Sequence, residues 1–483
     1  MGYYPIKCIH CMRPLRMEER CMKLDPEEIK SFESGFSKAA EVNLNEEVEI
    51  IEETSRSRRA DKKIIYKSLA QLRKENVIVN EETQNITISG EFQSIEEYRK
   101  DFVQSIDVKD LEVNGKKMSG RVRKFYCPYC HSEIIPLAGK MPMYLVSLMG
   151  PSSAGKTVYL TILHMLLSGR IYQLPQGFLS FENLGAMGKE FQSFALDIRR
   201  KNELPSTTQE LRKDPYLLRV SYVADPNKRE TNKQCLLGLI DMRGEMLQGD
   251  HNDDLLDFNV PQFKEANGFI MMVDPETLEG VYNRLPENYF GGRKIEQLNM
   301  TIGSMKEAIM ECITAEMGQI KCPSVVALAK QDILLKNYAQ LGIPLSQPVI
   351  APNFRPVAGT SLGEKYYGPM NQSTMQCIRY LSGSFAAFLD HTFYKPHFVS
   401  VSALGSMVQI IGNKIDNFEK IHPVRVEEPI LRLLMDFNFI PPFHGEEYFM
   451  DPKAVIDTWG KNFAERWIPQ SDSAEEQNTR SGR

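Results

Sequence analysis

The sequence has no run of about 20 apolar residues, which argues against a membrane-spanning helix. Its first residues, Met-Gly-Tyr-Tyr-Pro, lack a signal-peptide pattern, and no Ser or Thr follows Gly2 at the spacing of a myristoylation site. A strong net charge is also missing, because 58 Lys and Arg nearly balance 63 Asp and Glu. We therefore expect a cytoplasmic protein, with nucleic acid and membranes disfavoured as partners.

The nine cysteines are too few and too unevenly spaced for a disulfide framework. Four of them form two Cys-x-x-Cys pairs, Cys8 with Cys11 and Cys127 with Cys130. Two such pairs supply the four thiolates of a closed, tetrahedral Zn²⁺ site, and the pattern resembles a zinc ribbon. The alternative is a set of redox pairs or unliganded core cysteines. A closed site of this kind is not catalytic, so we expect a docking module.

The length of 483 residues predicts two or three domains. We expect the ribbon to comprise residues 1–24 and 120–140, separated by a charged α+β insert at 25–119. A larger domain is expected at 141–468, and the polar tail 469–483 is expected to be disordered.

Within the insert, acidic and basic blocks are typical of a solvated linker, with partner binding as the alternative. The pattern predicts helices over 62–74 and 96–105 and two strands, 77–79 and 86–88.

From residue 143 onward, short apolar runs alternate with helical patterns, which predicts a mostly parallel α/β sheet with helices on both faces. The expected strands are 144–149, 216–223, 236–240, 269–273, 324–329 and 398–401. The expected helices are 157–168, 302–316, 374–388 and 426–437. Residues 336–370 are too long for an ordinary connection and predict a lid or binding loop.

One segment matches the phosphate-binding pattern G-x-x-x-x-G-K-[S/T] in full, from Gly150 to Thr157. The glycines permit a tight loop whose N–H groups point at phosphate oxygens, Lys156 contacts the outer phosphates, and the Thr157 hydroxyl binds Mg²⁺. An apolar strand precedes the loop and an amphipathic helix follows it, as this chemistry requires. The expected nucleotide contacts are Gly150, Ser153, Ala154, Gly155, Lys156, Thr157 and Val158.

A buried strand ends in Asp241, and Gly244 follows three residues later. This D-x-x-G pattern is typical of a γ-phosphate sensor, in which the Asp holds Mg²⁺ through water and the Gly N–H senses the third phosphate. The alternative is an ordinary acidic turn at the end of a strand.

Two further strand ends predict recognition of the base. Lys330 and Asp332 form K-x-D, and a carboxylate at Asp332 can accept both the N1–H and the N2 amine of guanine, a donor pair that adenine lacks. Ser402-Ala403-Leu404 ends the next strand, where a backbone N–H can reach guanine O6.

Taken in this order, the four motifs make residues 141–440 resemble the TRAFAC class of Ras-like P-loop GTPases. The Asp-Met-Arg-Gly-Glu turn, the Phe-Ile-Met-Met-Val-Asp-Pro strand and the Arg-Val-Glu-Glu-Pro helix resemble the double-GTPase proteins of bacterial conflict systems. This resemblance implies a GTP- and GDP-binding protein that acts in antiviral defence or signalling beside protein partners.

The sequence departs from the class at two positions. Ala329 replaces the Asn or Thr that ties the base loop to the P-loop, which leaves a P-loop ATPase open as an alternative. Glu245 replaces the Gln that orients the attacking water, so we expect slow hydrolysis; a pseudo-GTPase scaffold without turnover is the third possibility. Thr207 or Thr208 is the candidate switch ligand of Mg²⁺, and a helix N-cap is the alternative role.

Overall fold

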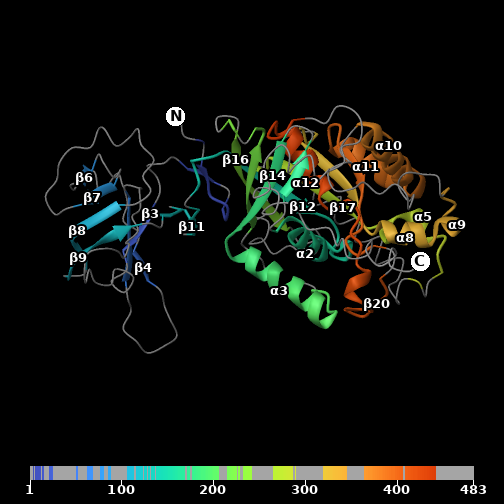
Figure 1. Ribbon diagram of the computed structural model, residues 1–483, viewed down its shortest axis with the longest axis horizontal. Helices are drawn as coiled ribbons and strands as arrows, with labels where there is room; N and C mark the ends of the chain where they lie inside the picture. The colour runs from blue at the N-terminus through green and yellow to red at the C-terminus, as the bar shows by residue number, and fades with distance from the viewer. Residues whose placement is uncertain are drawn as a thin grey trace, which may run out of the picture. The chain divides into compact units, whose positions relative to one another are not determined.

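The computed structural model divides into two compact units, Met1–Met143 and Tyr144–Arg483 (Figure 1). The structure describes residues 4, 6–11, 13–15, 21–24, 50–52, 63–68, 77–80, 85–88, 106–113, 116–122, 125–127, 129–130, 132–135, 137–168, 171–174, 177–205, 215–225, 227–228, 232–241, 265–286, 289, 319–344, 364–405 and 408–441.

The first unit is built from short antiparallel strands. Strand β1 (Ile6–Lys7) pairs with β2 (Pro14–Leu15), and β10 (Phe125–Tyr126) pairs with β11 (Glu133–Ile134). Each of these hairpins encloses one Cys-x-x-Cys pair. The second hairpin continues into a sheet of order β11-β10-β3-β5-β4, with β3 at Cys21–Leu24, β4 at Ile50–Glu52 and β5 at Lys63–Ser68.

The predicted helix over 62–74 is wrong where the structure describes it, because Lys63–Ser68 forms strand β5. Its sequence, Lys-Ile-Ile-Tyr-Lys-Ser, contains β-branched and aromatic residues that favour a strand, and β3 and β4 pair with it on both sides. The two predicted strands are confirmed as the antiparallel pair β6 (Val77–Asn80) and β7 (Asn85–Ile88). Strands β8 (Ile106–Val113) and β9 (Lys116–Val122), which the sequence pattern does not predict, complete that sheet. The predicted helix 96–105 lies outside the described residues.

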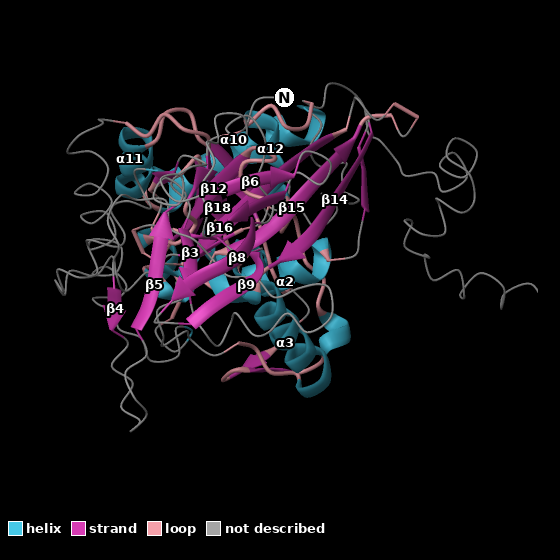
Figure 2. Ribbon diagram, turned by 90° about the vertical axis from the view of Figure 1, so that its left-hand side faces the viewer, coloured by secondary structure: helices cyan, strands magenta, loops and turns pink. Residues whose placement is uncertain are grey.

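The second unit contains an eight-stranded sheet of order β13-β14-β15-β16-β12-β17-β18-β19 (Figure 2). Strands β12, β17, β18 and β19 pair in parallel, whereas β13 to β16 pair antiparallel. The bounds are β12 Met143–Met149, β13 Ile171–Leu174, β14 Gly177–Leu184, β15 Tyr216–Val223, β16 Lys233–Asp241, β17 Gly268–Val273, β18 Ser324–Leu328 and β19 His397–Ser400. All six predicted strands are present, and the predicted α/β fold class is confirmed.

Helices cover both faces of this sheet. One face packs against α2 (Lys156–Leu167), α3 (Ala186–Lys201) and α12 (Glu428–Asp436), whose buried side chains join those of alternate strand positions in one hydrophobic core. On the other side, α10 (Glu364–Leu381) lies against β19 and is followed by α11 (Gly383–Thr392). Because both faces are covered, the parallel strands are mostly apolar on both faces, as in Met143–Met149, where Ser147 is the one residue with a hydroxyl group on an aliphatic side chain.

The other helices among the described residues are short: α5 (Glu279–Tyr282), α8 (Gln331–Lys336), α9 (Tyr338–Leu341) and the 3-10 turns η3 (Ser152–Ala154), η6 (Pro275–Thr277) and η9 (Phe418–Lys420). The single helix predicted over 374–388 is two helices, because Ser382 breaks the run and its hydroxyl caps α11 by accepting from the Phe385 N–H at 3.3 Å. The predicted helix 302–316 and most of the predicted lid lie outside the described residues, as does the tail.

A polar network lies inside the core between α2, β14 and β15. Nδ1 of His164 lies 3.0 Å from the hydroxyl of Tyr216, which donates to Oδ1 of Asn183 at 2.6 Å. Burial lowers the pKa of His164, against an opposing effect of the contact with Asn183. The imidazole is only 5% exposed, so its neutral form is the one that fits the core.

Across the described ranges, no helix combines the length and the apolar character needed to cross a membrane.

Candidate nucleotide site and cysteine cluster

The predicted phosphate loop joins β12 to α2. Gly150 has φ 148°, and a Cβ at this position would lie 2.4 Å from the carbonyl oxygen of Met272 on the neighbouring strand β17. Gly155 has φ 74°, a left-handed conformation that favours glycine, and α2 begins at the next residue. The packing of two parallel strands therefore requires the first glycine, and the turn into the helix favours the second.

Lys156 is buried at the start of α2. Its Nζ donates to the carbonyl oxygens of Gly150 at 2.8 Å and Pro151 at 3.1 Å, so the ammonium lies across the loop. These acceptors are neutral, and phosphate oxygens would make stronger charge-assisted bonds with the same group. Thr157 is half-buried in the first turn of α2, two residues after Gly155.

Asp241 is the last residue of β16, the strand next to β12 in the sheet, and it is half-buried. The structure thus places this carboxylate on the strand adjacent to the one that leads into the phosphate loop. The other predicted residues of the sensor and switch, Gly244, Glu245, Thr207 and Thr208, lie outside the described residues.

The two predicted base loops follow neighbouring parallel strands, β18 and β19. The hydroxyl of Ser402 donates to Oδ1 of Asp332 at 2.6 Å and accepts from the Gly405 N–H at 2.9 Å. This contact fixes the Asp332 carboxylate from the side of the second loop. The two motifs, 70 residues apart in sequence, therefore form one arrangement.

A cavity of about 890 Å³ connects the phosphate loop with the base loops. Its wall includes Ala154, Gly155 and Val158 at one end and Lys330, Asp332, Ser402, Ala403 and Leu404 at the other. A single cavity therefore contacts both the phosphate-loop residues Ala154 and Gly155 and the carboxylate-bearing residue Asp332.

Residues 144–313 match the Double-GTPase 2 family. The predicted resemblance to double-GTPase proteins is confirmed, and the match supports a GTP-binding protein. The matched segment includes the phosphate loop and Asp241 but ends before Lys330, so the assignment of the base loops depends on their geometry.

Two solved structures of Sup35 are also similar to this chain, one in complex with GMPPNP and one with GDP. The identities are 11% and 9%, with TM-scores of 0.20 and 0.19. Each alignment covers 55% of this chain but only 38% of the Sup35 chain. The comparison with curated proteins found no match.

Beside the base loops, the structure adds acidic residues that sequence reasoning missed. Nζ of Lys330 lies 2.9 Å from Oδ2 of Asp274 and 2.8 Å from Oε2 of Glu276. Burial lowers the pKa of Lys330, but the two carboxylates outweigh burial and raise it above its ordinary value. The Asp-Pro after β17 indicates the family but not the site, because 56 residues separate Asp274 from its partner.

A small hairpin borders the same cavity and was also missed. It comprises β20 (Ile410–Ile411) and β21 (Lys414–Ile415), and Ile410 and Gly412 line the cavity. Two backbone bonds hold it to the end of α3: Leu204 N–H donates to Asn413 at 2.7 Å, and Ile415 N–H donates to Asn202 at 2.8 Å. The short sequence of this segment gives little periodic signal, so only tertiary contacts define it.

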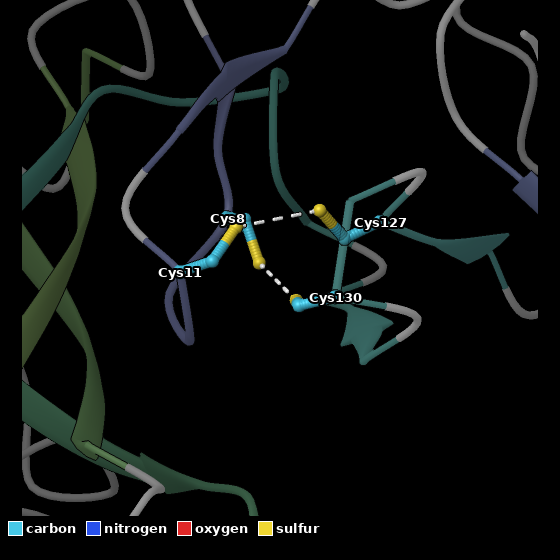
Figure 3. A group of neighbouring side chains, drawn as sticks. All are labelled: Cys8, Cys11, Cys127 and Cys130. Atoms are coloured by element: carbon cyan, nitrogen blue, oxygen red, sulfur yellow. Dashed lines mark hydrogen bonds between the residues drawn. The ribbon is translucent and has the colours of Figure 1, made fainter. Parts of the chain in front are cut away.

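The four predicted zinc ligands meet in the first unit. The sulfur atoms of Cys8, Cys11, Cys127 and Cys130 lie within 4.8 Å of one another, and Figure 3 shows the side chains converging from two loops. Sγ of Cys8 lies 3.5 Å from that of Cys130, and Sγ of Cys11 lies 3.6 Å from that of Cys127. The four are free cysteines, so the short distances are not disulfide bonds.

The two cysteine loops share one local conformation. The Cys8 N–H donates to the Arg13 carbonyl at 3.0 Å, and the Cys127 N–H donates to the Ser132 carbonyl at 2.9 Å, so each loop closes over the same number of residues. Between the loops, the guanidinium of Arg13 lies 4.7 Å from the ring centroid of Tyr129. Four sulfur ligands on two such turns fit a tetrahedral metal ion of the zinc type.

Proposed function

We propose that this protein is a Mg²⁺-dependent, GTP-binding switch with slow GTP hydrolysis. The observation that carries the proposal is the single cavity that joins the P-loop to Asp332, a carboxylate held by Ser402. In this proposal the phosphates of a guanine nucleotide would lie against the P-loop and its base would lie against Asp332. The Double-GTPase 2 match supports the same conclusion from the sequence side.

At the phosphate end, Lys156 would exchange its carbonyl partners for phosphate oxygens, and the loop N–H groups would cradle the same phosphates. Thr157, Asp241 and either Thr207 or Thr208 would hold Mg²⁺, which neutralises charge on the outer phosphates when bound. Gly244 would sense the third phosphate through its N–H group.

At the base end, Asp332 would accept from N1–H and the N2 amine of guanine, and a backbone N–H of Ala403 or Leu404 would donate to O6. Ser402 supports this role because its donated bond leaves the second carboxylate oxygen for the base. An ATPase is the alternative, and the observation that favours it is Ala329 in the first position of the base loop.

Slow turnover is proposed because Glu245 would place a negative charge near the γ-phosphate. A partner protein, or Arg243, would then complete the site by neutralising charge in the transition state. We place this switch in bacterial defence or signalling in the cytoplasm, with the partner contacting the cysteine unit, the insert or the switch segments. A scaffold without turnover is the competing role.

For the cysteine cluster we propose one structural Zn²⁺ bound by Cys8, Cys11, Cys127 and Cys130. The observation that supports it is the mutual distance of the four sulfur atoms, within 4.8 Å. Such a site is closed to substrate, so its role is to hold a docking module together.

Denaturing the purified protein and chromatographing the released nucleotide tests the main proposal directly. GDP or GTP is expected, whereas ADP or ATP would favour the ATPase. Turnover of added GTP by the isolated protein should stay below about 1 s⁻¹, the lower end for efficient enzymes. Faster turnover would favour a plain hydrolase, and none at all, with GTP bound, would favour the scaffold.

A further inference from the structure

Asp274 and Glu276 both form ion pairs with Lys330 beside the base loop, and we call these three residues the lysine clamp. Asp274 is fully buried and Glu276 is 7% exposed, and both contact the ammonium of Lys330. Lys330 itself has φ 49°, a left-handed conformation that a side chain with Cβ adopts only at an energetic cost. A strained residue of this kind persists where its surroundings hold it, and the two carboxylates are groups that do so here.

The clamp is itself held in place. Oδ1 of Asp274 accepts from the Glu276 N–H at 3.1 Å, which leaves Oδ2 for Lys330. The Thr277 hydroxyl donates to the Asp274 carbonyl at 2.7 Å, so the turn after β17 is closed on itself. The Asp274 carboxylate and the backbone of the turn are therefore held by bonds within the protein, and the Glu276 carboxylate reaches Lys330 from this turn.

The clamp adjoins the base site. Glu276 and Lys330 line the same cavity as Asp332, which follows Lys330 in the short K-x-D motif. Asp332 is the residue that would read guanine, and the angle of its carboxylate depends on the turn that begins at Lys330. The same wall thus carries the carboxylates of Glu276 and Asp332 together with Lys330 and Lys336, and the two cations offset the repulsion between these carboxylates and an anionic nucleotide.

The clamp lies next to Ala329, the position at which the Asn or Thr of related GTPases would contact the P-loop. Ala329 has no side chain to reach the P-loop, and its N–H bonds instead to the Val273 carbonyl at 2.9 Å. Gln331 N–H bonds to the Val401 carbonyl at 3.0 Å. The base loop is therefore fastened to the ends of β17 and β19, and the ion cluster is the charged part of that fastening.

We propose that Asp274 and Glu276 are positioning residues for base recognition, which hold Lys330 so that the Asp332 carboxylate meets the guanine edge. This inference rests on the proposed function. It assigns selectivity for guanine to a lysine clamp at the end of strand β17, in place of a tie between the base loop and the P-loop.

The test uses the full-length, zinc-loaded protein and its Asp274→Asn/Glu276→Gln variant. Dissociation constants are measured for GTP, ATP, ITP and inorganic tripolyphosphate, all with Mg²⁺. We expect the preference for GTP over ATP and over ITP to fall about tenfold or more, since charged hydrogen bonds are lost. Affinity for tripolyphosphate, which has no base, should change less than about twofold.

The matched control is Asp390→Asn, which removes an exposed ion pair with Arg379 from the same unit and should leave every ratio unchanged. Lys330→Met should lose the preference for GTP as the double variant does, and Lys330→Arg should keep part of that preference. If the double variant does not fold, Glu276→Gln alone answers the question, because Asp274 still holds the lysine, and its ratio should fall by a few-fold.

A folded double variant that keeps the wild-type GTP preference overturns the clamp while leaving the proposed function intact. Wild-type protein that prefers ATP overturns the proposed function, and the clamp with it. A purely structural role would lower the melting temperature and weaken all four ligands equally, and that result also overturns the clamp.

Discussion

The two units of the chain are stabilised in different ways. The second unit encloses its core with helices on both faces of eight strands, and the interior side chains of β12, β17 and β18 are almost fully buried. In the first unit, the hairpins around the cysteines have strands of two residues each, too short to be stable alone. The second unit therefore depends on apolar burial, whereas we expect the cysteine hairpins of the first unit to depend on the proposed metal ion.

Loss of the proposed metal ion should give the largest difference in stability between the two units. Replacing Cys127 and Cys130 with Ser should lose about one Zn²⁺ per chain and unfold the hairpins, since structural zinc contributes on the order of 10 kcal/mol to such folds. Elemental analysis measures the metal, and hydrogen exchange measures protection in each unit.

Protection across β12 to β19 should not change in that variant. Cys322→Ser, which alters a cysteine of the second unit, is the control and should retain the metal. Metal-free wild-type protein with protected hairpins would show that the cysteines serve another purpose.

Loss of the P-loop lysine should affect only the second unit. Lys156→Ala should weaken GTP binding at least tenfold, because charged hydrogen bonds contribute about 1.5–3 kcal/mol each. Calorimetry with GTP and Mg²⁺ measures the change, and zinc content should remain that of the wild type. The control is Lys336→Ala, which removes one positive charge from the wall of the 890 Å³ cavity without altering the P-loop. Unaltered affinity in Lys156→Ala would end the P-loop assignment.

A substitution at Asp332 should change the preference among nucleotide bases more than it changes the overall affinity for nucleotides. In Asp332→Asn the amide suits the N2-to-oxygen edge of xanthine, so preference should move from GTP towards XTP by about tenfold, given that an unpaired buried group costs about 1–3 kcal/mol. Competition among GTP, ATP and XTP measures this. An unmoved ratio would mean that Asp332 reads no guanine edge.

The same contrast explains what the sequence can predict. Apolar runs such as Tyr216–Val223 are long enough to predict strands, and the P-loop and cysteine pairs require their residues at set spacings. Strands β13 and β14 escape prediction because β13 has only four residues and polar residues interrupt the apolar run of β14. The helix expected over Lys63–Ser68 is wrong because its β-branched and aromatic residues favour a strand, and β3 and β4 pair with it on both sides.

The candidate site divides in the same manner. The motifs identify Asp332 and Ser402 separately, yet the hydrogen bond between them is a tertiary contact. Asp274 and Glu276 carry no motif, and only the approach of β18 to β17 brings Lys330 to them. A sequence motif can predict a site whose residues are close together in the chain. Contacts between residues on different strands can be identified only from the structure.

Acid should produce the smallest of these effects, and for a different reason in each unit. Because burial lowers the pKa of His164, the unfolded chain takes up a proton near its ordinary pKa of about 6.5 while the folded chain does not. The free energy of unfolding of the second unit should therefore fall as pH decreases below about 6.5.

Denaturant unfolding from about pH 7.5 to 5.5, followed by hydrogen exchange at β14 and β15, measures this slope. His164→Gln, which cannot titrate, should flatten it, and His391→Gln at an exposed position should not. In the first unit, we expect acid instead to protonate the thiolates that are proposed to bind zinc, and so to release the metal. An equal slope in His164→Gln would exclude the buried imidazole as its source.

The hairpin β20–β21 gives the cavity a mechanical connection to a distant part of the chain. Its backbone is bonded to Asn202 and Leu204, while Ile410 and Gly412 form part of the cavity wall. Leu204 precedes Thr207 by only three residues in the sequence. If Thr207 binds Mg²⁺ as proposed, we expect a shift of the chain at Thr207 to reach the β20–β21 hairpin through the backbone bond of Leu204, and so to change the cavity wall beside the base loops.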